Sequence, residues 1–366
     1  MKISCNKNDL LMGINIAMRA VPAKTTLPIL ESFLIVAGDD IKIITNDKDM
    51  GIETIIDGAV QERGKIAIDA RIFGEIVRKL PDSDVVIEAN SNYKVKVSCE
   101  DSLFSLNGRD PDEFPMLPET MEEKKIEISQ FSLKEIIRQT IFSIALTDTN
   151  TMMRGELFEI SGDMIKVVSL DSHRISIRKE KLKEVYGNHK IIVPGKTLNE
   201  ISRILEGDRE KTVEMSFDRN FVKFSFNNTK VISRLIEGEY FNVEQMISSD
   251  YETEMSVNKN DFLNVIDRAF TLTREGEKKP IVMDISDEEM KVDINTSLGS
   301  MDARLSVRKE GKDLYIGFNP KFFIDALKVI NDEEVTIYFV NSNAPCFIRD
   351  KEESYIYIIL PININR

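Results

Sequence analysis

The chain of 366 residues contains no tryptophan, two histidines and only three cysteines. Cys5, Cys99 and Cys346 are far apart and odd in number, which excludes a disulfide framework and the close spacing of a metal site. With 17 glycines and 11 prolines, the composition is not that of a fibrous or low-complexity protein. No apolar run is long enough to cross a bilayer. The cysteines are therefore expected to be small buried or incidental thiols in a reducing compartment.

Basic residues are also scarce, 49 against 62 acidic ones, and the formal net charge is −13. Taken alone, this charge argues against a nucleic-acid partner. The N-terminal stretch MKISCNKND lacks the basic and then apolar segments of a secretory signal, so we expect a cytoplasmic protein without a membrane partner.

Residues for catalysis are missing as well. His173 and His189 are the only histidines, no Ser or Cys lies in a nucleophile elbow, and no acidic pair stands out at metal-ligand spacing. VPGKT at 193–197 imitates the end of a phosphate-binding loop, but Lys190 occupies the position where that loop needs a glycine. We therefore expect no enzyme, no catalytic, cofactor-binding or metal-binding residues, and no cofactor.

What the chain does contain is a long internal repeat. NKND occurs at 6–9 and again at 258–261, each time before a stretch whose apolar residues recur with helical spacing. A looser copy begins near residue 132. The corresponding apolar positions are Leu10, Ile14, Ala17 and Met18, then Leu133, Ile137, Thr140 and Ile141, and finally Phe262, Ile266, Ala269 and Phe270.

A second set of helices repeats more clearly. RIFGEIVRKL begins at Arg71, KTLNEISRIL at Lys196 and KFFIDALKVI at Lys321, so both spacings are 125 residues. Their apolar positions correspond one to one and fall on one helical face. These positions are Phe73, Ile76, Val77 and Leu80; Leu198, Ile201, Ser202 and Leu205; and Phe323, Ala326, Leu327 and Ile330.

Alternating strands repeat with the same period. Hairpin patterns read FLIVAGDDIKII, LFEISGDMIKVV and VMDISDEEMKVD, and further alternating strands follow each second helix. The period of about 125 residues predicts three homologous α+β domains, 1–122, 126–249 and 252–366, each with two helices packed on antiparallel sheets. The predicted boundaries lie near MEEKK (121–125) and ISSDYE (247–252).

The outer faces of the second helices share a stripe of charge. Arg71, Lys196 and Lys321 correspond, as do Arg78, Arg203 and Lys328, with Glu75, Glu200 and Asp325 between them. For a single helix, a solvated face held by ion pairs is the ordinary interpretation. The rest of the chain carries −18, however, because the net charge is +5 in the six helical segments 8–19, 71–80, 132–145, 196–205, 260–274 and 321–330. Because salt screens charge beyond about 8–10 Å, this segregation permits weak, sequence-independent phosphate contacts.

Five motifs in order, TLPIL (26–30), LDSHRI (170–175), VPGKTLNEI (193–201), LIEGEY (235–240) and YIILPI (357–362), resemble the bacterial DNA polymerase III β subunit, the sliding clamp. The resemblance covers the whole chain. It implies the DNA-clamp fold and a head-to-tail dimeric ring that encircles duplex DNA as a replication processivity factor. Implied partners are the replicative polymerase, the clamp loader and repair proteins, which insert short linear peptides. Implied DNA-binding residues are Lys24, Arg71, Arg78, Arg138, Lys196, Arg203, Lys321 and Lys328.

The resemblance also implies a client-peptide pocket between the second and third domains, with an apolar C-terminal strand edged by Arg174. Phe241, Asn242 and Asn363 depart from the family pattern around it. A strand that is simply buried is the alternative. The implied pocket residues are Met153, Leu170, Ser172, His173, Arg174, Ile175, Met246, Pro345, Ile358, Ile359, Leu360, Pro361 and Ile362.

The implied dimer contact joins the first domain of one chain to the third domain of the other, through Phe104 and Leu106 on an edge strand and through Thr271 and Leu272. Phe104 and Leu106 could equally be ordinary core. The alternative function is an acidic three-domain scaffold that binds peptides but never encircles DNA.

Overall fold

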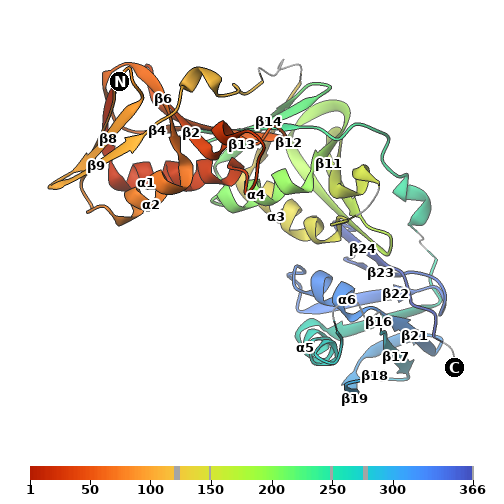
Figure 1. Ribbon diagram of the computed structural model, residues 1–366. Coiled ribbons are helices and arrows are strands. Elements are labelled where there is room, and N and C mark those ends of the chain that lie inside the picture. Colours follow the sequence, from red (N-terminus) through yellow and green to blue (C-terminus); the bar gives the residue numbers. More distant parts are fainter. Residues whose placement is uncertain (119–123, 148–149, 248–249, 275–278, 365–366) are drawn as a thin grey trace. The chain divides into compact units, whose positions relative to one another are not determined.

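The computed structural model describes residues 1–118, 124–147, 150–247, 250–274 and 279–364. They form two compact units, one of Met1–Phe131 with Glu200–Leu235 and one of Ser132–Asn199 with Ile236–Arg366. Figure 1 shows the ribbon of both. Within the described ranges, no helix is both long enough and apolar enough to span a membrane. The predicted boundary segments 121–125 and 247–252 fall partly outside these ranges.

Six α-helices occur among the described residues, two for each sequence repeat, as the periodicity predicts. The NKND motif marks helix starts: Asn6 and Asn258 cap the N-termini of their helices through their side-chain oxygens, and Asp9 and Asp261 lie in the first turns. The asparagine oxygens accept hydrogen bonds from free N–H groups of the first turn, and the aspartates stabilise the positive end of the helix dipole. The helices are α1 (Lys7–Ala17), α2 (Ala70–Lys79), α3 (Gln130–Thr140), α4 (Gly195–Ile204), α5 (Lys259–Phe270) and α6 (Pro320–Leu327).

Unit 1 contains two antiparallel sheets. The five-stranded sheet has the order β5-β1-β7-β8-β9 and the eight-stranded sheet the order β10-β13-β14-β15-β4-β3-β2-β6. Their strands are β1 (Lys2–Asn6), β2 (Ser32–Ala37), β3 (Ile41–Asn46), β4 (Met50–Ile56), β5 (Ala59–Glu62), β6 (Gly64–Asp69), β7 (Asp84–Ala89), β8 (Lys94–Cys99), β9 (Ser102–Asn107), β10 (Lys124–Ser129), β13 (Thr212–Phe217), β14 (Phe221–Phe226) and β15 (Thr229–Arg234).

Unit 2 also contains two antiparallel sheets, a seven-stranded one of order β11-β12-β24-β23-β22-β16-β20 and a four-stranded one of order β19-β18-β17-β21. Their strands are β11 (Gly155–Leu170), β12 (Arg174–Pro194), β16 (Thr253–Asn258), β17 (Ile281–Ser286), β18 (Glu289–Thr296), β19 (Gly299–Ser306), β20 (Arg308–Gly311), β21 (Leu314–Phe318), β22 (Glu334–Phe339), β23 (Cys346–Arg349) and β24 (Tyr355–Ile359).

The two largest sheets explain why the compact units do not follow the three repeats. In unit 1, β15 of the central repeat pairs with β4 of the first, with Val231 opposite Ile52. In unit 2, β12 of the central repeat pairs with β24 of the last, with Ile175 opposite Ile358. Backbone hydrogen bonds therefore continue from one repeat into the next, and the central repeat is divided between its neighbours' sheets.

The helices cover one face of each sheet, as the repeat pattern predicts. Phe73 and Val77 of α2 are fully buried with Ile14 of α1 in the core of unit 1. Phe262 of α5 and Phe323 of α6 meet edge to face, with ring centroids 5.5 Å apart, in the core of unit 2. All three cysteines are buried, as expected for small core thiols.

One sequence prediction needs correction, and a second holds although its hairpin lies within a single element. Phe270 is placed by its spacing on the apolar face of its helix, but it is the last residue of α5 and is 38% exposed. The predicted hairpin 157–168 is confirmed: both of its arms lie within β11, whose register against β12 is irregular on both sides of Gly162. Glu159 and Lys166 are 2.5 Å apart, whereas seven residues of straight strand would span about 23 Å. The chain therefore does turn back near Gly162, which has a positive φ.

Candidate functional site

In unit 1, the predicted DNA-binding side chains of the first repeat are exposed. Arg71 at the start of α2 donates to the carbonyl of Ala23, 3.1 Å away, and so holds the segment that carries Lys24. Arg78 pairs with Glu75 one turn earlier on α2, while Lys24 itself is exposed. These side chains are basic and exposed, but the ion pair with Glu75 weakens their field.

The basic side chains of α4 are likewise exposed, and one of them is ion-paired. Arg203 pairs with Glu200 at 3.1 Å, and Glu200 also contacts Arg19 at 3.6 Å, all within unit 1. Lys196, at the other end of the helix, is exposed. The predicted ion pairs between stripe positions therefore form along α2 and α4.

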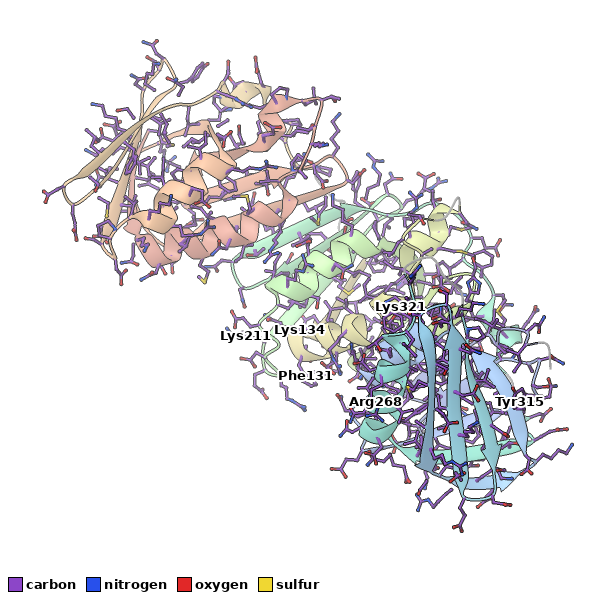
Figure 2. The ribbon with its side chains drawn as sticks, turned by 60° about the horizontal axis from the view of Figure 1, so that its bottom comes forward. Phe131, Lys134, Lys211, Arg268, Tyr315 and Lys321 are labelled. Carbon is purple, nitrogen blue, oxygen red and sulfur yellow. The ribbon has the colours of Figure 1, made fainter. Side chains whose placement is uncertain are left out.

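In unit 2, α6 carries Lys321, which is paired with Asp325 at 3.3 Å, and the exposed Lys328. Figure 2 shows Lys321 on α6 and Arg268, a further basic side chain, on α5. Arg138 differs from the other candidates: it is half-buried, makes two hydrogen bonds to Glu135, and reaches Asn331 of the last repeat at 3.0 Å. Of the predicted DNA-binding residues, Arg138 has the least freedom to meet a phosphate.

The predicted peptide pocket coincides with a second apolar cluster in unit 2, on the face of the seven-stranded sheet opposite α5 and α6. The alternation of a strand determines the faces: Ile356 and Ile358 of β24 belong to this cluster, whereas Tyr357 and Ile359 belong to the core beneath the helices. The buried members of the cluster are Leu157, Val168, Leu170, Ile175, Ile177, Ile192, Val243, Phe347, Ile356 and Ile358.

A segment of the chain's own linker partly covers this cluster. Tyr240, Phe241 and Ile247 pack against it, and the Tyr240 hydroxyl donates to the carbonyl of Gly155 at 3.2 Å. Met246, in the short 3-10 helix Val243–Met246, remains 51% exposed. The arrangement leaves apolar surface accessible at the edge of a largely buried patch, which is a common form of peptide site.

The other predicted pocket residues occupy several positions. Met153 packs on the cluster, and Leu170, Ile175 and Ile358 are buried within it. Ser172 and His173 are exposed in the turn between β11 and β12, where the carbonyl of His173 accepts from the N–H of Leu360 at 2.9 Å. Leu360 is 40% exposed, whereas Ile359 is buried on the opposite face of the sheet. Pro345, Pro361 and Ile362 are half-buried.

Arg174 does not form the predicted polar edge of the pocket. It is only 8% exposed, and its neighbour Ile175 points to the pocket face, so Arg174 lies on the helix side of β12. Its guanidinium contacts Asp171 at 3.0 Å and Asp325 at 2.7 Å, and donates to the carbonyl of Phe142. Arg174 therefore fastens the central repeat to α6 of the last repeat.

The sequence patterns do not predict the residues that surround Arg174. Asp325 was assigned to the charged stripe, yet it also holds Arg174. The guanidinium carbon of Arg174 lies over the rings of Phe142 and Phe322, 5.4 and 4.7 Å from their centroids. Ile177 could have been predicted from the sequence, because it follows Ile175 of the LDSHRI motif by two residues and therefore lies on the same face of the strand.

The predicted dimer residues lie in two places, on the outer strand β9 and just after helix α5. β9 is an outer strand of its sheet, where Phe104 is 37% exposed and Leu106 packs partly against the core. In unit 2, Thr271 is exposed just after α5 and Leu272 packs partly against that unit's core. Leu106 is thus partly core, as the alternative interpretation of β9 holds, whereas the exposed Phe104 remains only a predicted dimer contact.

The comparisons with known proteins agree along the whole chain. Family models of the N-terminal, central and C-terminal domains of the DNA polymerase III beta subunit match residues 1–118, 127–242 and 244–363. The beta sliding clamp of Bacillus subtilis is 34% identical, with 99% of each chain covered, and that of Staphylococcus aureus 32%, again with 99% of each.

Solved structures show the same similarity in three dimensions. A putative DNA polymerase III beta subunit from Eubacterium rectale is 53% identical with a TM-score of 0.96, and the Bacillus subtilis sliding clamp is 32% identical with a TM-score of 0.96. Both comparisons cover 100% of each chain.

Three α+β repeats with paired helices on antiparallel sheets, matched over their full length, define a DNA sliding clamp. The chain belongs to the DNA polymerase III beta subunit family. A clamp of this family is a non-catalytic processivity factor in DNA replication, so the chain is not an enzyme.

Proposed function

We propose that two copies of this chain close head to tail into a ring around duplex DNA, in the cytoplasm. The observation that carries this proposal is the threefold recurrence of a weakly basic helix on a strongly acidic chain, whose net charge is −13. Attraction of this strength is too small to retain DNA, whereas enclosure needs no attraction. We propose 1–122, 126–249 and 252–366 as the three domains.

The ring is proposed to contact phosphates through exposed side chains of its helices and of the segment before Pro28. The exposed members are Lys24, Arg71, Arg78, Lys196, Arg203, Lys321 and Lys328, and Arg138 is retained in a lesser role because Glu135 and Asn331 occupy its donors. Because none of these contacts reads a base, binding is independent of sequence.

Retention on DNA tests the ring directly. The clamp is loaded onto nicked circular DNA with its loader, and the protein-bound fraction is followed after a restriction enzyme linearises the circle. We expect retention on the circle and rapid loss from the linear product, because only the free end lets a closed ring slide off. Equal loss from both forms, with loading shown beforehand, contradicts the proposal.

The apolar cluster between the central and last repeats is proposed to receive a client's short linear peptide, so that replicative polymerase, loader and repair proteins share one site. Leu170, Ile175 and Ile358 provide the buried floor, and the exposed Met246 and Leu360 provide the movable edge. Met153, Ser172, His173, Pro345, Pro361 and Ile362 complete the proposed site, while Arg174 and Ile359 support it from the opposite face.

A pocket variant must leave the sheet intact. β24 lies between β12 and β23, so removing it would break two ladders as well as the pocket. Met246→Ala and Leu360→Ala change only exposed side chains. We expect each to weaken binding of a client peptide about tenfold, with unfolding unchanged, whereas Met116→Ala, an exposed methionine of unit 1, should have no effect.

A further inference from the structure

Next to the apolar cluster, the same face of β11 and β12 becomes basic. Strand register fixes this placement: the pair Val168–Ile177 belongs to the cluster, and the next pair along the same face is Lys166 opposite Lys179. On the other side, Leu157 pairs with Ile192 in the cluster. The next pair on that face is Glu159 opposite Lys190. Three lysines therefore lie about 7 Å from the apolar floor.

These side chains surround a hollow of about 540 Å³, which opens to solvent. Its lining consists of Glu159, Ile160, Ser161, Met164, Lys166, Lys179, Asn188, His189 and Lys190. Glu159 is the only acidic side chain in this lining, against three lysines. The lining alone thus carries two more positive than negative charges, beside the proposed peptide site of an otherwise acidic chain.

The sheet does not need this arrangement. Lysines directly opposite each other, such as Lys166 and Lys179, destabilise a strand pair. Carboxylates from other segments offset the cost: Glu244 beside the pocket pairs with Lys166, and Glu353 reaches Lys179 at 3.5 Å. Burial lowers the pKa of Lys166, but the carboxylates of Glu159 and Glu244 outweigh burial and raise the pKa, so this lysine stays charged.

Two of the lysines remain available to a ligand. The side chain of Lys190 is 73% exposed although it contacts Glu159, and the contact of Lys179 with Glu353 is long. Glu244 and Glu353 come from segments outside the hollow, and a carboxylate on a bound peptide could take the same positions. The hollow therefore fits acid side chains better than neutral ones.

We propose that this lysine hollow binds an acidic flank of the client peptide, two or three residues away from the apolar anchors. An extended peptide advances about 3.3 Å per residue, so this offset spans the step from the apolar floor to the lysine pairs. Among clients with the same apolar anchors, those with acidic residues beside the anchors would then bind with higher affinity. The inference rests on the proposed peptide pocket.

Binding of three labelled peptides to the full chain tests it by fluorescence anisotropy. All carry the same two leucines and one phenylalanine; one has neutral flanks, one has two aspartates before the anchors, and one has two aspartates after them. We expect one acidic peptide to bind about three- to tenfold more tightly than the neutral peptide at low salt, and the gain to vanish near 0.5 M salt.

The gain should also disappear in the double variant Lys179→Gln and Lys190→Gln, with the neutral peptide bound as before. Lys183→Gln, an exposed lysine of β12 outside the hollow, is the matched control and should keep the full gain. Equal affinity for all three peptides, or a gain that survives in the double variant, overturns the inference alone. Failure of every peptide to bind overturns the peptide pocket itself, and the inference with it.

Discussion

At the scale of single residues, the least expected group is Glu156 on β11. Its side chain is fully buried, and neither carboxylate oxygen has a hydrogen-bond partner among the described residues. Burial raises the pKa of Glu156 well above its usual value, and the nearby Thr140 hydroxyl only partly offsets this, since it donates to the carbonyl of Ile136 at 2.7 Å. The folded chain therefore favours the protonated form of this carboxyl more strongly than the unfolded chain does.

This protonation makes stability depend on pH in a stated direction. Because the pKa is higher in the folded chain than the value of about 4.3 in the unfolded chain, the group favours folding fully below pH 4 and loses that contribution as pH rises toward the folded pKa. Glu156→Gln cannot titrate. Above about pH 4.3 and below the raised folded pKa, its stability should rise with pH relative to the original chain, by at most about 1.4 kcal/mol per pH unit.

Urea unfolding of both chains at pH 5, 6 and 7 measures the difference, and Glu184→Gln, an exposed glutamate of β12, serves as the control. For this control, the difference in unfolding free energy from the original chain should not change with pH. A flat difference for Glu156→Gln as well would mean that the carboxyl is ionised in the folded chain and that its burial is relieved by movement of the surrounding strands.

Arg174 leads to a second prediction at this scale. Arg174→Ala would take an ion-pair partner from Asp171 and from Asp325, which keeps only the more exposed Lys321, at a cost of about 3–5 kcal/mol. Arg174→Lys should recover only part of this, because an ammonium cannot bridge two acids and a carbonyl in one plane. Denaturant unfolding, with Arg178→Ala for comparison, checks the ranking; equal stability of Arg174→Ala and the original chain would contradict it.

At the scale of elements, periodicity predicted the helices well because the apolar side chains at equivalent positions are buried in every repeat. Phe73, Leu198 and Phe323 are all fully buried, as their equivalent positions require. What the pattern could not predict was pairing between repeats. The positions of Arg174 and Ile359 depend on the register of β12 against β24, and a shift of one residue would exchange the two faces. This register cannot be predicted from local sequence, because β12 and β24 are far apart in the chain.

The outer strand β9 gives a prediction about assembly. Its backbone edge is open within unit 1, and Phe104 adds an exposed aromatic ring to it. If β9 joins a second copy, Phe104→Asp should bury a charge in the contact and weaken dimerisation by at least about tenfold. Analytical ultracentrifugation measures this. Val185→Asp, which alters an exposed valine of β12, should remain a dimer, and a dimeric Phe104→Asp chain would place the contact elsewhere.

At the scale of the whole molecule, the charge of −13 determines how the ring can hold DNA. A short linear duplex can enter and leave the ring through its ends, so its binding depends only on a few lysine and arginine contacts. The affinity should therefore fall steeply as salt rises, by a factor set by the number of phosphates neutralised. Retention on closed circular DNA should not change between about 0.1 and 0.5 M salt, because leaving requires the dimer to open.

Both quantities can be measured on one preparation, by gel filtration of loaded circles and by anisotropy with short duplexes. The double variant Arg71→Ala and Arg78→Ala should weaken the short-duplex binding and lower its salt dependence, yet leave the lifetime on circles unchanged. Lifetimes on circles that shorten in parallel with short-duplex affinity would show that DNA is held by attraction, and a closed ring would then not explain processivity.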